Sequence, residues 1–431
     1  MLVALLCLIA FAMLALGFEM LLVMGVPSVL AKLAFHPQMP DLVIPQKLLG
    51  GVNVGTLLSI PFFMFAADLM AHGVIAQRLT TMVRVLVGHR SGGIGHTTVG
   101  SCMAFGAVCG SAPATVAALG RLSFPELLRS GYSERFSLGL IASSAECALL
   151  IPPSITLIIY GWLTGTSIAA LFAGGLAVGI VLGVAFMALV QWETWRVGAA
   201  KGEPSKRGER LAAFKLGSWA LGLPIVILGG IYSGIFTATE AAAVSVVYAM
   251  LVETVVYRTL GWRDVVRVAE ASGVAVTAVF ILLAMGSLLS HFVILADVPG
   301  LLASAVKAIG ANWVMFLLFV NVAMFVAGMF IDPNSTLLLF VPTLFPVAVA
   351  LGIDPVHFGL VVCLNICIGM ITPPFGLDLF VASGTLNRPV EAVVAGIWPF
   401  VLVNLLVLVL ISYVPAISTA LPNLLGLGGR L

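Results

Sequence analysis

The sequence has few charged residues. Asp, Glu, Lys and Arg make up 9% of its 431 residues, whereas soluble globular proteins carry about 25%. This scarcity excludes a soluble globular domain, and the 61% hydrophobic content excludes a disordered chain or a nucleic-acid-binding protein. With a mean hydropathy of +1.18, the composition predicts a polytopic membrane protein that has the lipid bilayer as its solvent.

The sequence also lacks the motifs of several enzyme classes. Its six cysteines lie in apolar stretches without a Cys-x-x-Cys pair, so we expect them to pack as small apolar residues. There is no G-x-x-x-x-G-K-[ST] loop for nucleotide phosphates and no H-E-x-x-H zinc motif, so neither enzymatic activity nor an organic cofactor is expected. Because no Lys or Arg precedes Lys32, we expect the first segment to be a retained membrane segment and not a signal peptide.

Long apolar runs predict an all-α fold of about 10–11 transmembrane helices, since about 20 apolar residues cross the bilayer core. Residues 74–90 carry three arginines among apolar positions and predict an interfacial amphipathic helix. Crossings are predicted near residues 2–17, 18–35, 50–71, 134–163, 167–193, 216–236, 238–257, 271–292, 355–384 and 391–414, with a polar link at 36–49.

Two further segments predict re-entrant hairpins. Residues 91–130 are rich in glycine and interrupted at Gly110–Thr115, and residues 312–351 are interrupted at Ile331–Thr336. Each flank of the first interruption has about 15 residues, or roughly 23 Å of helix, which is too short to cross alone. Polar backbone at membrane depth is tolerated only inside protein or beside a water-filled cavity. We therefore predict that both tips are buried at membrane depth.

The basic residues sort to one side of these crossings. If residues 194–215 form a cytoplasmic loop, 16 of the 20 Lys and Arg residues lie on its side of the membrane. The opposite side keeps Lys32, Lys47, Lys307 and Arg430. Residues 417–431 are predicted to form a C-terminal tail. The charge distribution thus supports the predicted crossings.

The chain contains an internal repeat at an offset of 221 residues. Thr115 aligns with Thr336, and the pair Pro152-Pro153 aligns with Pro373-Pro374. The first copy has five predicted crossings, and an odd number inverts the second copy. Inverted repeats with broken helices are typical of secondary transporters. We predict a first repeat over residues 1–193, with a hairpin at 91–130 and a broken helix at 134–163, and a second over 216–416, with a hairpin at 312–351 and a broken helix at 355–384.

The tandem prolines predict a cation site at each broken helix. Proline has no N–H, so the carbonyls four residues earlier lose their helical partners. Such carbonyls are costly in hydrocarbon unless a cation, water or hydroxyl uses them. Hard oxygen ligands suit Na⁺, and the helix N-termini at the tips suit an anion. The alternative is that the prolines only kink the helices and the tips are only turns.

The predicted substrate- and ion-binding residues come from both tips and both breaks. Asp332 at a tip and Asp378 after a break are expected to bind or tune a cation, and Glu146 is expected to face the cavity, because carboxylates at membrane depth are functional candidates. Glu19 and Glu240 are equally explained as helix-packing partners. The predicted Na⁺ ligands are Ser111, Thr115, Asn334, Ser335, Thr336 and Thr372, and the other candidates are Ala148, Leu149, Pro152, Pro153, Ser154, Asp332, Gly369, Met370, Pro373 and Asp378.

Five segments carry motifs that resemble a single family. They are residues 110–120 (GSAPATVAALG), 150–155 (LIPPSI), 228–243 (LGGIYSGIFTATEAAA), 352–359 (GIDPVHFG) and 372–376 (TPPFG). Together they closely resemble the DctM-like large membrane subunit of tripartite ATP-independent periplasmic (TRAP) transporters. The resemblance covers essentially the whole chain.

That resemblance implies an elevator-type permease of the ion-transporter superfamily in the bacterial or archaeal cytoplasmic (inner) membrane. It implies Na⁺-coupled uptake of an organic acid, such as a C4-dicarboxylate or sialic acid, with a small four-helix membrane subunit and a periplasmic substrate-binding protein as partners. The family's Na⁺ sites carry over onto Ser111 and Thr115 with the carbonyls before Pro152, and onto Asn334, Ser335 and Thr336 with Thr372 and the carbonyls before Pro373.

Two positions look less typical of the family. Position 146 is expected to hold a small or hydroxyl residue but is Glu146, and position 378, where Asn is commoner, is Asp378. The nearest rival hypothesis is a stand-alone Na⁺/dicarboxylate symporter of related fold, which would transport without partners. An intramembrane enzyme or assembly factor would instead act independently of Na⁺.

Overall fold

The first half of the chain is built from helices in the residues that the structure describes. A computed structural model of the protein describes residues 2–198 and 207–427. The first of these ranges contains α1 (Leu2–Ala15), α2 (Met20–Phe35), α3 (Val43–Val52), the 3-10 helix η1 (Gly55–Leu58), α4 (Ser59–His72), α5 (Ile75–Val87), α6 (Gly93–Cys109), α7 (Ala112–Arg129), α8 (Glu134–Ser144), α9 (Cys147–Leu150), α10 (Ile155–Thr164) and α11 (Ile168–Val197).

The second half is helical as well. It contains α12 (Arg207–Tyr232), α13 (Ala238–Leu251), the π-helix η2 (Val252–Val256), α14 (Trp262–Leu295), α15 (Val298–Ala308), α16 (Trp313–Gly328), α17 (Pro333–Ala350), α18 (Pro355–Met370), α19 (Leu377–Leu386), α20 (Val390–Tyr413) and α21 (Ala416–Leu424). No strand occurs in either described range. The predicted all-α fold is confirmed.

Several helices are long and apolar enough to cross a bilayer. In the described residues there are seven such helices, or eight when the bent pair Glu134–Leu150 and Ile155–Thr164 counts as one span. The predicted number of 10–11 is higher because it includes shorter apolar helices such as α2, whose 16 residues give about 24 Å of helix. Conversely, α17 lies within the predicted hairpin 312–351 but counts as a candidate span by length and composition, since its helix continues past Pro342 and Pro346.

The interruptions of the two hairpins and of the two broken helices lie at the predicted positions. Helices α6 and α7 pack against each other and are separated by Gly110 and Ser111, and α16 and α17 are separated by residues 329–332. The broken helix at 134–163 bends by 41° between α9 and α10. The second broken helix is interrupted between Met370 and Leu377. Both proline pairs are joined by cis peptide bonds.

Some predicted loops are helical. The predicted link 36–49 contains most of α3, and the predicted crossing 50–71 is interrupted after α3, before η1 and α4. The predicted loop 194–215 was too long, because α11 continues to Val197 and α12 begins at Arg207; residues 199–206 lie outside the described part. Long Lys and Arg side chains let a helix continue beyond the apolar core while their charges reach water. The predicted tail 417–431 begins as α21.

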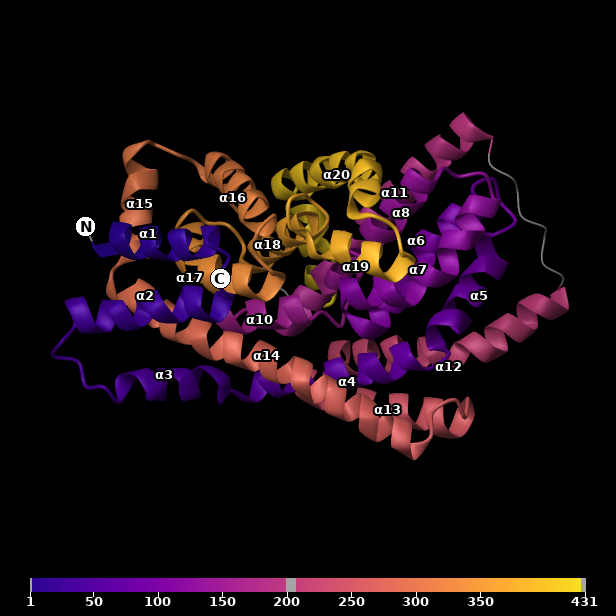
Figure 1. Cartoon of the computed structure of the whole chain (residues 1–431), viewed down its shortest axis with the longest axis horizontal. Helices are drawn as coiled ribbons and strands as arrows, with labels where there is room; N and C mark the ends of the chain where they lie inside the picture. The colour runs from indigo at the N-terminus through magenta and orange to yellow at the C-terminus, as the bar shows by residue number, and fades with distance from the viewer. Residues whose placement is uncertain (1, 199–206, 428–431) are drawn as a thin grey trace.

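Corresponding helices recur at the offset of 221 residues. The first-half helices begin at residues 93 (α6), 112 (α7), 134 (α8), 155 (α10) and 168 (α11). Their counterparts in the second half begin at residues 313 (α16), 333 (α17), 355 (α18), 377 (α19) and 390 (α20). Helix α14 occupies the positions that correspond to α3, η1 and α4. It packs on α2, α3 and α4 and runs along the molecule as one 34-residue helix (Figure 1).

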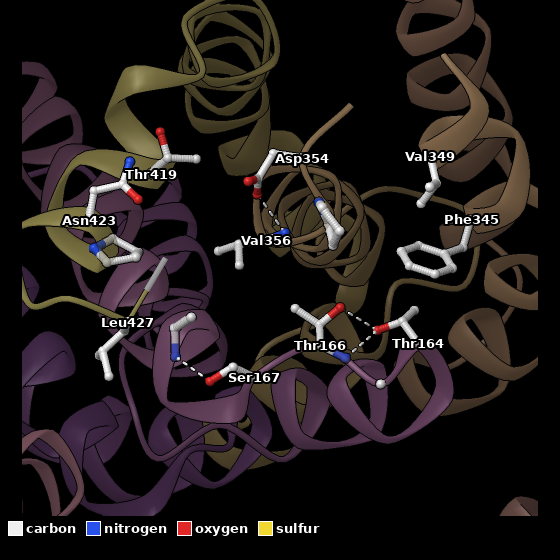
Figure 2. A pocket seen from close by; sticks show the side chains of 14 residues that line it. Thr164, Thr166, Ser167, Phe345, Val349, Asp354, Val356, Thr419, Asn423 and Leu427 are labelled. Atoms are coloured by element: carbon white, nitrogen blue, oxygen red, sulfur yellow. Dashed lines mark hydrogen bonds between the residues drawn. The ribbon is translucent and has the colours of Figure 1, made fainter. Parts of the chain in front are cut away.

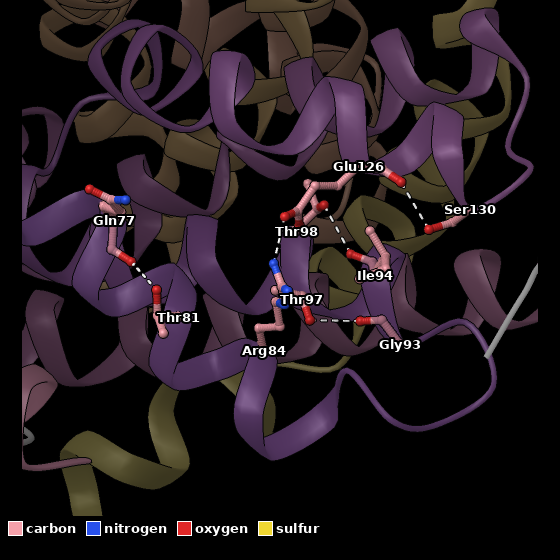
Figure 3. A network of polar contacts seen from close by, with 9 residues as sticks. All are labelled: Gln77, Thr81, Arg84, Gly93, Ile94, Thr97, Thr98, Glu126 and Ser130. Atoms are coloured by element: carbon pink, nitrogen blue, oxygen red, sulfur yellow. Dashed lines mark hydrogen bonds and ion pairs between the residues drawn. The ribbon is translucent and has the colours of Figure 1, made fainter. Parts of the chain in front are cut away.

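The amphipathic helix predicted at 74–90 forms as α5, which packs against α6 and α12. Arg84 on α5 donates a hydrogen bond of 2.5 Å to Glu126 on α7. Around this ion pair the hydroxyls of Thr97, Thr98 and Ser130 bond to carbonyls one helical turn earlier (Figure 3). The ion pair connects α5 to the first hairpin at the end remote from its tip.

Candidate functional site

The first hairpin tip lies directly against the first proline break. Gly110, between α6 and α7, has a φ of +61°, and a β-carbon built on it would lie 1.9 Å from the carbonyl oxygen of Pro153. Only glycine fits both the left-handed backbone and this close approach. One helical turn before the tip, on α6, Gly106 packs against Ala148, and a β-carbon on it would lie 2.6 Å from the Ala148 Cα. The structure thus brings together tip 110–115 and break 151–154.

In the second half, the segments that lead into the tip and the break are in contact. A β-carbon on Gly369 would lie 2.6 Å from Gly328, so the backbones of α18 and α16 are in contact there. The amide of Phe375, beyond the proline pair, donates to the carbonyl of Met329 over 3.1 Å. The segment after Pro374 is thereby fixed to the segment that leads into the second tip.

Equivalent side chains at the two tips make equivalent hydrogen bonds. Ser111 and Asp332 are the N-caps of α7 and α17: Ser111 Oγ accepts from the Ala114 amide over 3.5 Å, and the Asp332 carboxylate accepts from two amides over 3.1 Å. Thr115 and Thr336 each donate a 2.8 Å hydrogen bond to the carbonyl of the cap residue. These threonine oxygens retain lone pairs for a further donor or a cation.

The predicted candidates differ in burial. Thr115, Ser154, Ser335 and Thr336 are fully buried, and Thr372 is buried as well. Ser111, Asp332 and Asn334 are half-buried. The Ser335 hydroxyl is buried and has no hydrogen-bond partner among the described residues. A buried hydroxyl without a partner is costly, so a ligand that satisfies it would gain that free energy on binding.

Two of the four carbonyls predicted to be released at the breaks are hydrogen-bonded. The Leu149 carbonyl accepts from the Ser154 hydroxyl over 2.5 Å, and the Gly369 carbonyl accepts from the Thr372 amide over 3.1 Å. The Leu149 carbonyl is thus used by a hydroxyl in place of its helical N–H, as the prediction allowed, whereas the Gly369 carbonyl accepts from the backbone amide three residues on, which the prediction did not include. For Ala148 and Met370 the residue four positions later is still a proline, so the prediction stands for those two.

Two predicted carboxylates occupy unlike environments. Asp332 is satisfied by its capping bonds, whereas Asp378, in the first turn of α19, is fully buried with both carboxylate oxygens unpartnered in the described structure. Glu146, between α8 and α9, is fully buried too, and its carboxylate accepts a 2.9 Å hydrogen bond from Asn404 on α20.

The sequence prediction missed the buried amides. Asn404 lies inside the apolar helix α20, and a second chain runs from Asn365 through Asn321 to Ser412, with bonds of 2.9 and 3.0 Å. Each amide stands within an otherwise apolar stretch, and that isolation is the signal that could have identified them, because polar groups at membrane depth usually bond across helices.

Two cavities open elsewhere in the molecule. One has a volume of about 360 Å³ and lies between the α10–α11 turn, the start of α18 and α21 (Figure 2). The other, of about 480 Å³, lies between the same turn and residues 231–239. Neither of these two is lined by a tip or a break. In the first cavity Ser167 and Asp354 are the N-caps of α11 and α18, so their side-chain oxygens already accept hydrogen bonds from backbone amides.

The geometry now described agrees with comparisons to known proteins. Residues 7–417 match the family "Tripartite ATP-independent periplasmic transporter, DctM component". The chain belongs to this family. It is 39% identical to the C4-dicarboxylate TRAP transporter large permease protein DctM of Rhodobacter capsulatus, over 93% of this chain and 94% of that one. It is 40% identical to the ectoine TRAP transporter large permease protein TeaC of Halomonas elongata, over 96% and 97%.

Solved structures support the fold of this DctM-family chain. The crystal structure of the Alcanivorax borkumensis YdaH transporter superposes with a TM-score of 0.66 at 13% identity, covering 88% of each chain. At that identity the likeness concerns the fold alone. Membership of the TRAP family makes the protein a multi-span transport subunit of the bacterial inner membrane, which confirms the predicted class and location.

Proposed function

We propose that this chain is the large permease subunit of a TRAP transporter that couples the uptake of an organic acid to Na⁺. The observation that carries the proposal is the contact of each hairpin with a proline-broken helix, at Gly110 against Pro153 and, in the second half, at Gly328 against Gly369 and at the hydrogen bond from Phe375 to Met329. The two junctions concentrate hydroxyl and carbonyl oxygens inside an apolar protein. Oxygen ligands without thiolate or imidazole are those that suit Na⁺.

Each junction offers its own set of Na⁺ ligands. At the first, these are the hydroxyls of Ser111 and Thr115 and the Ala148 carbonyl. At the second, they are Ser335, Thr336 and Thr372, with Asn334 and the Met370 carbonyl. The unpartnered, buried Ser335 hydroxyl supports the second set most directly, since binding an ion would supply its missing partner.

The same tips favour an anionic substrate. Helices α7 and α17 begin at the tips, and a helix N-terminus carries a partial positive charge and free N–H groups. No Lys or Arg lies within residues 110–115 or 331–336, so bound Na⁺ and these dipoles would neutralise a carboxylate. The substrate class is proposed to be an organic acid, as the named C4-dicarboxylate relative transports. An elevator motion of the hairpins and broken helices would carry it across.

Sodium binding can be tested without knowing the substrate. The purified chain is heated in detergent with NaCl or with KCl at equal ionic strength, and Tm is measured. A ligand that binds only the folded state at about 100 times its Kd stabilises it by about 2.7 kcal/mol. We expect Na⁺ to raise Tm in the wild type and expect this increase to shrink in Thr115→Val and in Thr336→Val.

A matched control separates ion binding from simple loss of a hydroxyl. Thr98→Val removes a buried threonine hydroxyl that bonds to the Ile94 carbonyl in the same hairpin, away from the tip. It should keep the full Na⁺-dependent increase in Tm. An equal increase in all four proteins, or none in the wild type, would contradict the proposed Na⁺ sites.

Partner dependence requires reconstituted uptake. Proteoliposomes that contain the chain with its small four-helix membrane subunit are given radiolabelled succinate or radiolabelled ectoine together with the periplasmic binding protein. We expect uptake that requires an inward Na⁺ gradient and is lost when either partner is left out. Uptake by the chain alone would establish the stand-alone symporter instead.

A further inference from the structure

Helix α5, helix α12 and the turn between α13 and α14 meet in one part of the molecule (Figure 1). The Tyr257 hydroxyl donates a 2.5 Å hydrogen bond to the Leu216 carbonyl, and the Tyr248 hydroxyl donates one of 2.7 Å to the Trp219 carbonyl. The guanidinium carbon of Arg78, in the first turn of α5, lies 5.6 Å from the centroid of the Tyr257 ring. These contacts hold the three elements together as one surface.

A buried carboxylate anchors the turn to the backbone between α4 and α5. Glu253, in the π-helix η2, is fully buried and accepts a hydrogen bond from the Thr259 hydroxyl. Its carboxyl carbon occupies the space that a side chain on Gly73 would need, since a β-carbon built there would lie 2.0 Å away. The surface is therefore preformed, which lowers the cost of binding a ligand to it.

This surface carries an excess of positive charge. Residues 207–219 and 252–267 contain six Lys and Arg residues but three Asp and Glu residues. We call these two segments, together with Arg78, the basic surface. None of the salt bridges among the described residues includes Arg78, Lys215 or Arg258. Lys215 and Arg258 are also exposed, so their charges are open to a ligand.

The three acids of the basic surface leave these cations uncompensated. Glu253 is buried, and Asp264 pairs with Arg267 over 3.6 Å. Glu209 lies six residues before Lys215 on α12, which is nearly two helical turns. An anion from outside the chain would therefore gain the attraction of several cations at once.

Aromatic and apolar side chains place the basic surface at the level of the lipid headgroups. Trp219 and Trp262 are both exposed, and tryptophan is enriched where the headgroups meet the hydrocarbon. Val255 and Val256, just before the basic turn, are exposed as well and continue the apolar face of α13. The cations thus lie at the edge of the lipid-facing surface, on the predicted cytoplasmic side of the membrane.

We infer that the basic surface binds the phosphate headgroup of an anionic phospholipid. The guanidinium groups of Arg78 and Arg258 match the geometry of phosphate oxygens, and the Lys215 ammonium adds a further charge. The exposed tryptophans would contact the glycerol and the upper part of the acyl chains. The bound lipid bridges α5, α12 and the α13–α14 turn. The inference requires neither Na⁺ nor an organic acid.

Lipid binding can be measured on the protein together with its small membrane subunit. The complex, purified in a neutral detergent, is titrated with short-chain phosphatidylglycerol or phosphatidylcholine by calorimetry. We expect the wild type to bind phosphatidylglycerol more tightly. A Lys or Arg near an anionic surface contributes about 1 kcal/mol, so Lys215→Gln/Arg258→Gln should weaken this binding about 30-fold.

A matched double variant controls for the overall loss of charge. Arg121→Gln/Arg129→Gln removes two exposed cations of α7 on the same predicted side of the membrane. It should bind phosphatidylglycerol as tightly as the wild type. If the Lys215→Gln/Arg258→Gln variant fails to fold, the wild type decides: its Tm should be higher in nanodiscs with phosphatidylglycerol than in pure phosphatidylcholine, and high salt should reduce the difference.

Four results would overturn the lipid site. They are equal binding of the two lipids by the wild type, an equal loss of binding in both double variants, and a Tm that does not depend on phosphatidylglycerol. The fourth is binding of free glycerol 3-phosphate as tight as that of phosphatidylglycerol, which would show a site for soluble phosphates. Binding by the chain alone but not by the complex would show that the small subunit covers the basic surface, and would also refute the lipid as its occupant.

Discussion

The two tip-and-break junctions share their backbone contacts but differ in charge. At both, a threonine donates a 2.8 Å hydrogen bond to the carbonyl of the helix cap, and the hairpin approaches the broken helix too closely for a side chain between them, at Gly110 against Pro153 and at Gly328 against Gly369. The first tip is capped by the neutral Ser111 and the second by the Asp332 carboxylate. The repeat therefore keeps the threonine bond to the cap residue, while the cap residue itself sets the charge at each tip.

The two junctions also differ in where a glycine of the hairpin touches the broken helix, in the tip itself at the first and one helical turn before the tip at the second. At the first, Gly110 has a left-handed backbone and touches the Pro153 carbonyl. At the second, Gly328 and Gly369 approach through helical backbone without a positive φ. A substitution at the first junction therefore meets both backbone strain and a collision, whereas one at the second meets a collision alone.

The largest effect is expected for Gly110→Ala. A β-carbon at 1.9 Å from the Pro153 oxygen cannot be accommodated without separating the tip from the break, and the left-handed backbone adds roughly 1–2 kcal/mol. We expect Tm to fall strongly and uptake to be lost. Gly165→Ala is the matched control, because Gly165 has a φ of +71° and no atom within 4 Å of the new carbon. A similar loss in both variants would show that strain, and not contact with the break, is responsible.

A smaller effect is expected at the second junction, from Gly369→Ala. Its β-carbon would lie 2.6 Å from the Gly328 backbone, and overpacking of this kind costs about 1–3 kcal/mol. The substitution on the other side of this contact, Gly328→Ala, places its β-carbon 3.1 Å from Gly369 and should destabilise the fold less. The Tm values of the two variants, measured by thermal unfolding, test this order of destabilisation. If Gly328→Ala were the more damaging, the close contact would not control the stability of this junction.

Most of this arrangement could be predicted from the sequence, because prolines and glycines act locally. Pro152 and Pro373 end their helices wherever they lie, since the missing N–H does not depend on the fold. Helix α15 was missed, although its positions correspond to those of α5 at the repeat offset and could have been found that way. The hydrogen bonds to the Leu149 and Gly369 carbonyls could not be predicted from the sequence, since they depend on how the chain turns at each break. The pairing of Asn404 with Glu146 spans 258 residues and required the fold.

The cap residues should have a moderate effect. Asp332→Ala removes the acceptor of two backbone amides and should cost about 1 kcal/mol, whereas Asp332→Asn keeps a capping side chain and should cost less. If the carboxylate also attracts the ion at the second tip, Asp332→Asn should reduce the Na⁺-dependent increase in Tm while barely changing Tm without Na⁺. An unchanged response to Na⁺ would limit Asp332 to capping.

The smallest effect is expected far from the tips, where the two halves differ again. Arg84 pairs with Glu126 between α5 and α7, whereas the positions that correspond to them, Ala305 and Val347, place apolar residues between α15 and α17. The two charged side chains are 54% and 32% exposed, and ion pairs this exposed contribute about 0–1 kcal/mol. Arg84→Ala should therefore shift Tm slightly, and high salt should reduce that shift. A large loss of uptake at unchanged Tm would show instead that this ion pair moves the first hairpin.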